Sequence, residues 1–175
     1  ILSDLFKLHP FKRNKIIGIH NVILTILNIL LCIYPSPIYI SYFKTIIHQN
    51  PYVFHTSVRH NLTLYQDCSD SLLISTLKKV GLWEACCHQL DYELTGDNFS
   101  GGQIIKLEIA RAILRGKQVI LADEMMASLD AASSKEISNV LKQLPNSIIE
   151  IAHHYNLEDY DAVYRIENKS IVRIK

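Results

Sequence analysis

Short apolar runs alternate along this chain with stretches in which apolar residues recur at every third or fourth position. The runs at 15–18 (KIIG), 118–122 (QVILA) and 147–152 (SIIEIA) are typical of buried strands. Two shorter apolar segments, at 162–166 and 171–174, predict closing strands near the end of the chain.

Helical periodicity separates these strands. The predicted helices cover residues 22–32, a stretch from Ser69 or Asp70 to Gly81, residues 82–90, residues 101–115 and residues 132–144. Apolar strands that alternate with helices predict an α/β fold, a mostly parallel sheet flanked by helices. Ligands of such sheets bind beyond the carboxyl ends of the strands.

The composition narrows the classes of function. The 175 residues are enough for one domain, nearly half of them (49%) are apolar, and the net charge of +1 gives no reason to expect a nucleic-acid partner. The most apolar run, residues 22–34, is shorter than the ~20 residues that cross a membrane, and it predicts a buried helix. The chain opens on Ile1 rather than Met, so we expect a piece of a longer chain.

Polar residues gather where the predicted strands end. Asp123 and Glu124 follow the run VILA, and His153 follows SIIEIA. Standing alone, the two carboxylates could equally be a strand-end charge or a helix cap. Ser100-Gly101-Gly102-Gln103, however, opens a predicted helix, and a Ser-Gly-Gly turn there presents backbone N–H groups and a positive dipole end to an anion.

These features occur together in one known family. The segment FSGGQIIKLEIARAILRGKQVILADEMMASLD (99–130) resembles the signature motif, Walker B segment and D-loop of ABC ATPases, in their usual order and spacing. HQNPYVFHTSVRHNL (48–62) is similar to the Q-loop region of exporters, IIEIAHH (148–154) to the switch-histidine segment and DAVYRIENKSI (161–171) to the closing hairpin. The resemblance covers nearly the whole chain. It implies a P-loop NTPase-like sheet, a helical subdomain at roughly 68–100 and a reduced antiparallel part.

The resemblance also implies roles in hydrolysing ATP with Mg²⁺, a reaction that depends on positioning and charge neutralisation. Asp123 would hold Mg²⁺ through water, Glu124 would orient and deprotonate the attacking water, and His153 would contact the γ-phosphate. Gln49 would approach the metal and that water. The remaining nucleotide contacts fall on Ser100, Gly101, Gly102, Gln103 and the D-loop residue Asp130.

The phosphate-binding loop departs from the family. A Walker A loop reads G-x-x-x-x-G-K-[ST], and here Gly18 and the metal-binding Thr25 match it. Ile23 replaces the second glycine, and Leu24 replaces the lysine. A β-branched residue brings bulk and lacks the backbone freedom of glycine, and the leucine removes a cation from a site that must hold phosphates. The segment between Thr25 and Gln49 is also shorter than usual.

These observations favour the ATP-binding domain of an ABC exporter at the cytoplasmic face of the cell membrane. Its partners would be a transmembrane domain and a second ABC ATPase domain, arranged head to tail, without nucleic acid. The alternative is a non-catalytic domain that supplies its signature motif to an intact partner. A soluble ABC ATPase acting on DNA or ribosomes is disfavoured by the near-neutral charge and the lack of a long coiled-coil insertion.

Overall fold

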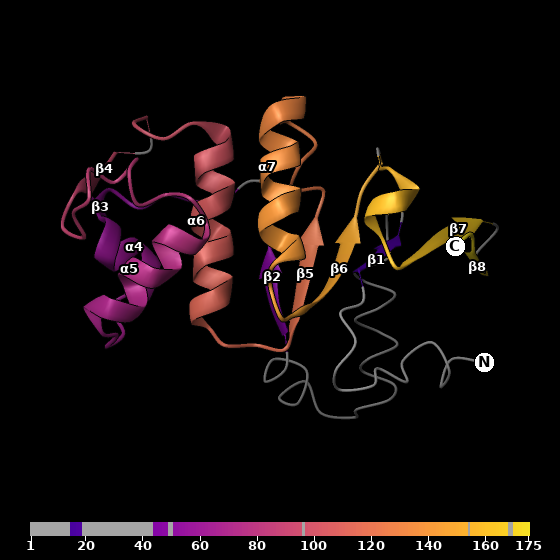
Figure 1. The fold of residues 1–175 in the computed structure, drawn as a ribbon, viewed down its shortest axis with the longest axis horizontal. Coiled ribbons are helices and arrows are strands. Elements are labelled where there is room, and N and C mark those ends of the chain that lie inside the picture. Colours follow the sequence, from indigo (N-terminus) through magenta and orange to yellow (C-terminus); the bar gives the residue numbers. More distant parts are fainter. Residues whose placement is uncertain (1–14, 19–43, 49–50, 96, 154, 168–169) are drawn as a thin grey trace.

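A six-stranded sheet forms the centre of the computed structural model, which describes residues 15–18, 44–48, 51–95, 97–153, 155–167 and 170–175 (Figure 1). The strands of this sheet are β1 (Lys15–Gly18), β2 (Lys44–Ile47), β5 (Val119–Asp123), β6 (Ser147–Ile151), β7 (Ala162–Glu167) and β8 (Ser170–Arg173). Their order across the sheet is β2-β5-β6-β1-β7-β8. All neighbours are parallel except β7 and β8. The predicted α/β fold with a mostly parallel sheet is confirmed.

Three central strands end at the same level of the sheet. Asp123 at the end of β5 pairs in register with Ile151 of β6, and Gly18 at the end of β1 pairs with the same residue from the other side. The carboxyl ends of β5, β6 and β1 therefore form one continuous edge, where a parallel sheet binds its ligands.

In the described part of the chain, four helices accompany the sheet. They are α4 (Val58–Thr63), α5 (Asp70–Lys79), α6 (Gly101–Leu114) and α7 (Ala131–Lys142). Figure 1 shows α6 and α7 side by side, each running against the direction of the strands, so that both helices begin at the edge where β5 and β6 end. The short helices α4 and α5 pack on the other side of α6, next to a small antiparallel pair formed by β3 (Thr56–Ser57) and β4 (Glu93–Leu94).

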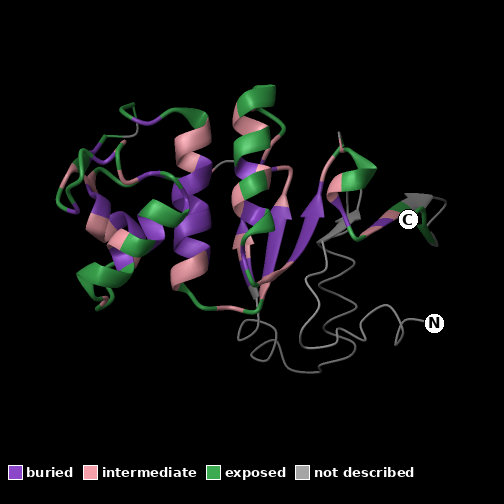
Figure 2. Cartoon of the chain, viewed as in Figure 1, coloured by how far each residue is buried: buried purple, intermediate pink, exposed green. Residues whose placement is uncertain are grey.

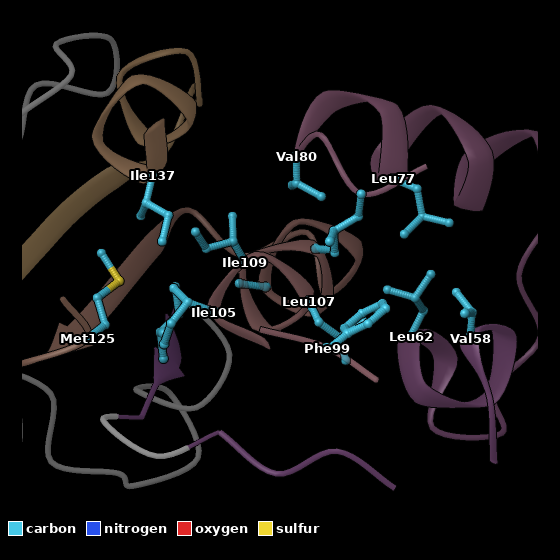
Figure 3. Packing of buried hydrophobic residues seen from close by; sticks show 14 of the residues in the cluster. Val58, Leu62, Leu77, Val80, Phe99, Ile105, Leu107, Ile109, Met125 and Ile137 are labelled. Atoms are coloured by element: carbon cyan, nitrogen blue, oxygen red, sulfur yellow. The ribbon is translucent and has the colours of Figure 1, made fainter. Parts of the chain in front are cut away.

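Helix α6 is buried on almost every side because it lies between these two parts of the fold. Ile105, Leu107 and Ile109 are each at most 3% exposed (Figure 2). Figure 3 shows side chains from four neighbouring segments around α6: Val58 and Leu62 of α4, Leu77 of α5, Met125 and Ile137. A helix with apolar residues all round is typical of such an interior position.

Most predicted elements are observed with shifts of a residue or two at their ends. The predicted strands at 15–18, 118–122 and 147–152 correspond to β1, β5 and β6. Helix α7 ends at Lys142 rather than at 144. The helix predicted over 82–90 is wrong, because Cys87 (φ 51°) and His88 (φ 56°) adopt left-handed backbone angles that stop it after one turn.

Several short elements were not predicted, and one predicted helix lies outside the described residues. Lys44–Ile47 forms edge strand β2 of the main sheet, and Ser57 caps the short helix α4 by accepting a hydrogen bond from the N–H of His60. The predicted helix at 22–32 lies outside the described part of the chain. Within the described part, every helix is too short or too polar to span a bilayer.

Candidate functional site

Two predicted site residues meet at the carboxyl edge of the sheet. Glu124 follows β5 directly, and His153 lies two residues beyond the end of the neighbouring strand β6. Nε2 of His153 is 3.0 Å from Oε1 of Glu124. The Glu124 side chain is 11% exposed and the His153 side chain 51% exposed, so a mostly buried carboxylate meets a half-exposed imidazole. Such a pair can orient water or exchange a proton with it.

The backbone fixes where Glu124 points. Its N–H donates a hydrogen bond of 2.9 Å to the carbonyl oxygen of Ile151, which extends the pairing of β5 with β6 by one residue. Its φ is 45°, in the left-handed region that L-residues other than glycine rarely adopt. Such angles cost of order 1–3 kcal/mol and are concentrated at functional sites, so the conformation supports a functional role for this carboxylate.

Asp123 is the last residue of β5, at the same edge of the sheet as the end of β1. It is half-buried and lies level with Ile151, which separates it from Gly18. Within the described residues, no three His, Cys, Asp or Glu side chains are grouped closely enough to hold a metal ion. This does not conflict with Mg²⁺ bound together with phosphates, because that ion usually takes only one or two protein carboxylates and fills its shell with phosphate and water oxygens.

The Ser-Gly-Gly turn (residues 100–103) is held by reciprocal capping. Oγ of Ser100 accepts a hydrogen bond of 3.3 Å from the N–H of Gln103, and Oε1 of Gln103 accepts one of 2.8 Å from the N–H of Ser100. This capping box fixes the start of α6, whose first N–H groups have no partner within the helix. The turn is thus ordered and lies at the positive end of a helix of 14 residues, a position that favours an anion.

The two glycines of this turn lie against the segment that starts α7. A Cβ at Gly101 would come within 3.4 Å of Leu129, and a Cβ at Gly102 within 3.4 Å of Ser133. These are van der Waals contact distances, so the turn packs directly on the start of α7. The sequence did not indicate this contact, since nothing in either segment shows that α6 and α7 pack side by side.

Asp130 stabilises the start of α7. Its side chain accepts hydrogen bonds of 2.9 Å from the N–H groups of Ser133 and Ala132, and one of 2.7 Å from the Ser133 hydroxyl. The hydrogen bonds from the Ser133 N–H and hydroxyl lower the pKa of Asp130, and the Ala132 N–H adds to them. The structure therefore shows Asp130 as the N-cap of α7, beside the Ser-Gly-Gly turn.

A buried guanidinium connects α6 to the segment that follows Gln49. Nε of Arg111 donates to the carbonyl oxygen of Asn61 and Nη1 to that of Tyr52, both at 2.7 Å. Nη1 also lies 2.8 Å from a carboxylate oxygen of Glu108, and Nη2 donates to Oδ1 of Asn61 at 2.9 Å. The Arg111 side chain is only 4% exposed. Sequence reasoning missed this role, although charged residues inside so apolar a helix were a signal for it.

Asn61 carries the network into the loop before α4. Its side-chain amide is fully buried; it donates to the carbonyl oxygens of Phe54 and Ser57 and accepts from the N–H of Phe54. The guanidinium of Arg111 also lies 5.6 Å from the centre of the Phe54 ring. The backbone on the carboxyl side of Gln49 is therefore set by α6. Gln49 and Thr25 lie outside the described residues, whereas Gly18 is described as the last residue of β1.

Known proteins match this sequence. The sequence model described as "ABC transporter" matches residues 43–127. The chain is 31% identical over 129 residues to the ABC transporter gloK of Glarea lozoyensis, which covers 71% of this chain and 10% of that protein. It is 35% identical over 132 residues to the microcin-J25 export ATP-binding/permease protein McjD of Escherichia coli (71% of this chain, 23% of that protein).

A relative named for import also matches. The phosphate import ATP-binding protein PstB 1 of Streptococcus thermophilus is 31% identical over 132 residues, which is 67% of this chain and 49% of that protein. The chain thus spans at most about half the length of these three relatives and only a tenth of gloK.

The buried Arg111 network predicts a large loss of stability on truncation. Arg111→Met leaves the buried Glu108 carboxylate and the carbonyl groups of Asn61 and Tyr52 without the guanidinium, and breaking a buried pair in this way costs about 3–5 kcal/mol. Urea unfolding followed by circular dichroism measures the loss. The control is Arg59→Met, whose partners Asp70 and Asp91 are exposed and whose removal should cost less than about 1 kcal/mol. Equal losses in the two variants would show that the buried network is not a main source of stability.

Proposed function

Since this chain belongs to the ABC transporter family as an ATP-binding domain, we propose that it couples ATP binding and hydrolysis to export across a membrane. The observation that carries the proposal is the contact of Glu124 with His153 at the carboxyl edge of the sheet. Helix α6 begins with the Ser-Gly-Gly turn on the same side of the sheet (Figure 1). This combination of a base, a histidine and an anion-binding turn suits phosphoryl transfer to water.

The residues at the carboxyl edge of the sheet would have separate roles in the reaction. Glu124 would accept the proton of the attacking water at a carboxylate oxygen, and His153 would hold that carboxylate in place through Nε2. Asp123, at the end of β5, would hold Mg²⁺ through water, with Gln49 and Thr25 as the other groups near the metal. MgATP, when bound, supplies the phosphoryl group and most of the charge that the site must neutralise.

The Ser-Gly-Gly turn would act on a nucleotide held mainly by a second ATPase domain. Ser100 is exposed at the start of α6, so the turn is accessible to a partner. A head-to-tail dimer would bring the turn of each domain to the nucleotide of the other. Asp130 and Gly101 would belong to the same interface, because Gly101 lies against Leu129, the residue before Asp130.

Export across the membrane requires a transmembrane partner. The name of McjD joins ATP-binding and permease functions in one exporting protein, and McjD is 35% identical to this chain. The Q-loop-like residues 48–62 also resemble those of exporters, whereas PstB 1 is named for import. We therefore place the domain at the cytoplasmic face of a membrane, with a transmembrane domain as its partner.

A second function is favoured by the Walker A departure. Ile23 and Leu24 stand where a glycine and a lysine would bind phosphates, and both lie outside the described residues. A domain with this loop would bind ATP poorly and serve a partner through its Ser-Gly-Gly turn, without hydrolysis of its own.

The catalytic role of Glu124 is tested by Glu124→Gln, assayed as phosphate release from a dimer with an intact ABC ATPase domain. The amide cannot accept the water proton, so the hydrolysis contributed by this site should be lost while ATP binding is retained. The matched control is Glu84→Gln, which removes a carboxylate from a turn outside the site. Phosphate release equal to that of the unmodified chain would exclude Glu124 as the base.

The role of the turn in the partner's site is tested by Ser100→Arg. The longer side chain would occupy the surface where the partner's γ-phosphate docks, so ATP-driven association with an intact homologue should fall. Light scattering in the presence of ATP measures association, and Ser71→Arg, on the exposed side of α5, controls for added charge and bulk. If Ser100→Arg associates as well as the Ser71→Arg control, the turn does not act in trans.

The two functions are separated by restoring the Walker A residues. Charge-assisted hydrogen bonds contribute roughly 1.5–3 kcal/mol each, so Leu24→Lys should strengthen MgATP binding by about tenfold to a hundredfold. Combining it with Ile23→Gly should strengthen binding further, because the glycine removes bulk near the phosphates. Calorimetric titration measures the dissociation constants of the chain and both variants. Tight binding by the unmodified chain, unimproved by both changes, would show that Ile23 and Leu24 do not weaken ATP binding, and it would remove the reason for the second function.

A further inference from the structure

A buried hydrogen bond joins the two ends of the segment that carries His153. The hydroxyl of Tyr160 donates to Oε2 of Glu150 over 2.9 Å, and the two residues are 6% and 2% exposed. A carboxylate in such surroundings is costly to bury unless it is hydrogen-bonded. This contact therefore constrains both residues strongly.

The sheet order makes this bond a bridge over β1. Glu150 lies near the end of β6, and Tyr160 lies just before β7 begins. Strand β1 separates β6 from β7, and its residue Ile17 pairs in register with Glu150 on one side and with Val163 on the other. The bond thus links two strands that are not neighbours and closes residues 151–159 into a loop with a fixed base.

The position of Glu124 is fixed by burial and by its backbone, whereas the position of His153 is less constrained by packing. Glu124 is 11% exposed, and its N–H is hydrogen-bonded to β6. The His153 side chain is 51% exposed, so packing covers only about half of it and its position depends on the course of its own loop.

We propose that Glu150 and Tyr160 are positioning residues that hold His153 beside Glu124 by fixing the base of the His153 loop. The contact with Glu124 is a feature of the structure itself, and only its consequence for ATP hydrolysis rests on the proposed function. In this role both residues act through the course of the loop and not on the reacting groups.

The far side of the loop is anchored independently, so Tyr160 is a firm attachment point. The short 3-10 turn η1 (Leu157–Asp159) starts at Asn156, whose side chain accepts from the N–H of Glu158. Lys142 of α7 pairs with Asp159 at 2.6 Å, and Nζ of Lys175 donates to the carbonyl oxygen of Tyr160 over the same distance. The hydrogen bond from Tyr160 to Glu150 connects this fixed segment to β6, the strand that precedes His153.

The direction of the hydrogen bond determines which substitutions break it. Burial raises the pKa of Tyr160 far above its usual range, and the charge of Glu150 adds to that effect, so the phenol keeps its proton and donates. Tyr160→Phe removes the donor and keeps the ring. Glu150→Leu removes the acceptor at similar size, whereas Glu150→Gln keeps a side-chain oxygen that can still accept.

The test follows the ring signals of His153 in ¹H–¹³C correlation spectra of the whole chain without nucleotide. His153→Gln assigns the signals, and Glu124→Leu shows how far they move when no side-chain oxygen remains beside the imidazole. Tyr160→Phe and Glu150→Leu should each displace the His153 signals towards their positions in Glu124→Leu. Glu150→Gln should leave them near those of the unmodified chain, as should the control Tyr164→Phe, which removes a phenol hydroxyl from β7.

Each outcome decides the proposal. Unmoved His153 signals in folded Tyr160→Phe or Glu150→Leu would overturn it, and so would a Glu150→Gln displacement as large as theirs. If one of the two breaking variants fails to fold, the other still tests the proposal by the same comparison. The spectra are recorded without nucleotide, so their result does not depend on phosphate release. If the His153 signals are displaced but no variant of the chain releases phosphate, the positioning role stands and the proposed catalytic function fails.

Discussion

The parallel pairing of β5 with β6 is the constraint on which the candidate site depends. Asp123 is level with Ile151, and the N–H of Glu124 continues the same ladder, so the carboxylate emerges beside the segment that carries His153. A slip of one residue in this register would turn every side chain of one strand to the opposite face. Ile120 and Leu121 face opposite sides of β5 and both are buried, so the strand is covered on its two faces.

Helix α6 connects the parts of the fold that lie on its two sides. Its first turn, Ser100 to Gln103, packs on the start of α7, and Arg111 near its other end holds the backbone that follows Gln49. A displacement of α6 would therefore move both the Ser-Gly-Gly turn and that backbone. This gives a physical route by which the predicted Q-loop segment and the predicted signature could change position together.

Two features break the local sequence pattern in different ways. In the predicted phosphate-binding loop, Ile23 and Leu24 would remove phosphate-binding groups without an evident substitute in the sequence. Glu150 places a carboxylate in a buried strand, but here Tyr160 supplies a hydrogen bond, so a potentially destabilising residue becomes part of a connection between β6 and the start of β7. The catalytic proposal rests on the ordered Glu124–His153 pair and not on the predicted loop.

The sequence by itself determined the local features: apolar runs became strands, the Ser-Gly-Gly turn capped a helix, and Asp123, Glu124 and His153 fell at strand ends, because local spacing and capping chemistry set these. It did not determine contacts between distant segments. The guanidinium of Arg111 on Tyr52 and Asn61, the packing of Gly102 on Ser133 and the bond of Tyr160 to Glu150 join residues whose proximity follows from strand order and helix packing. Local backbone angles can also override periodicity, as the turn at Cys87 and His88 shows. Tertiary structure decided these contacts because each depends on surfaces that exist only after the sheet and α6 have come together.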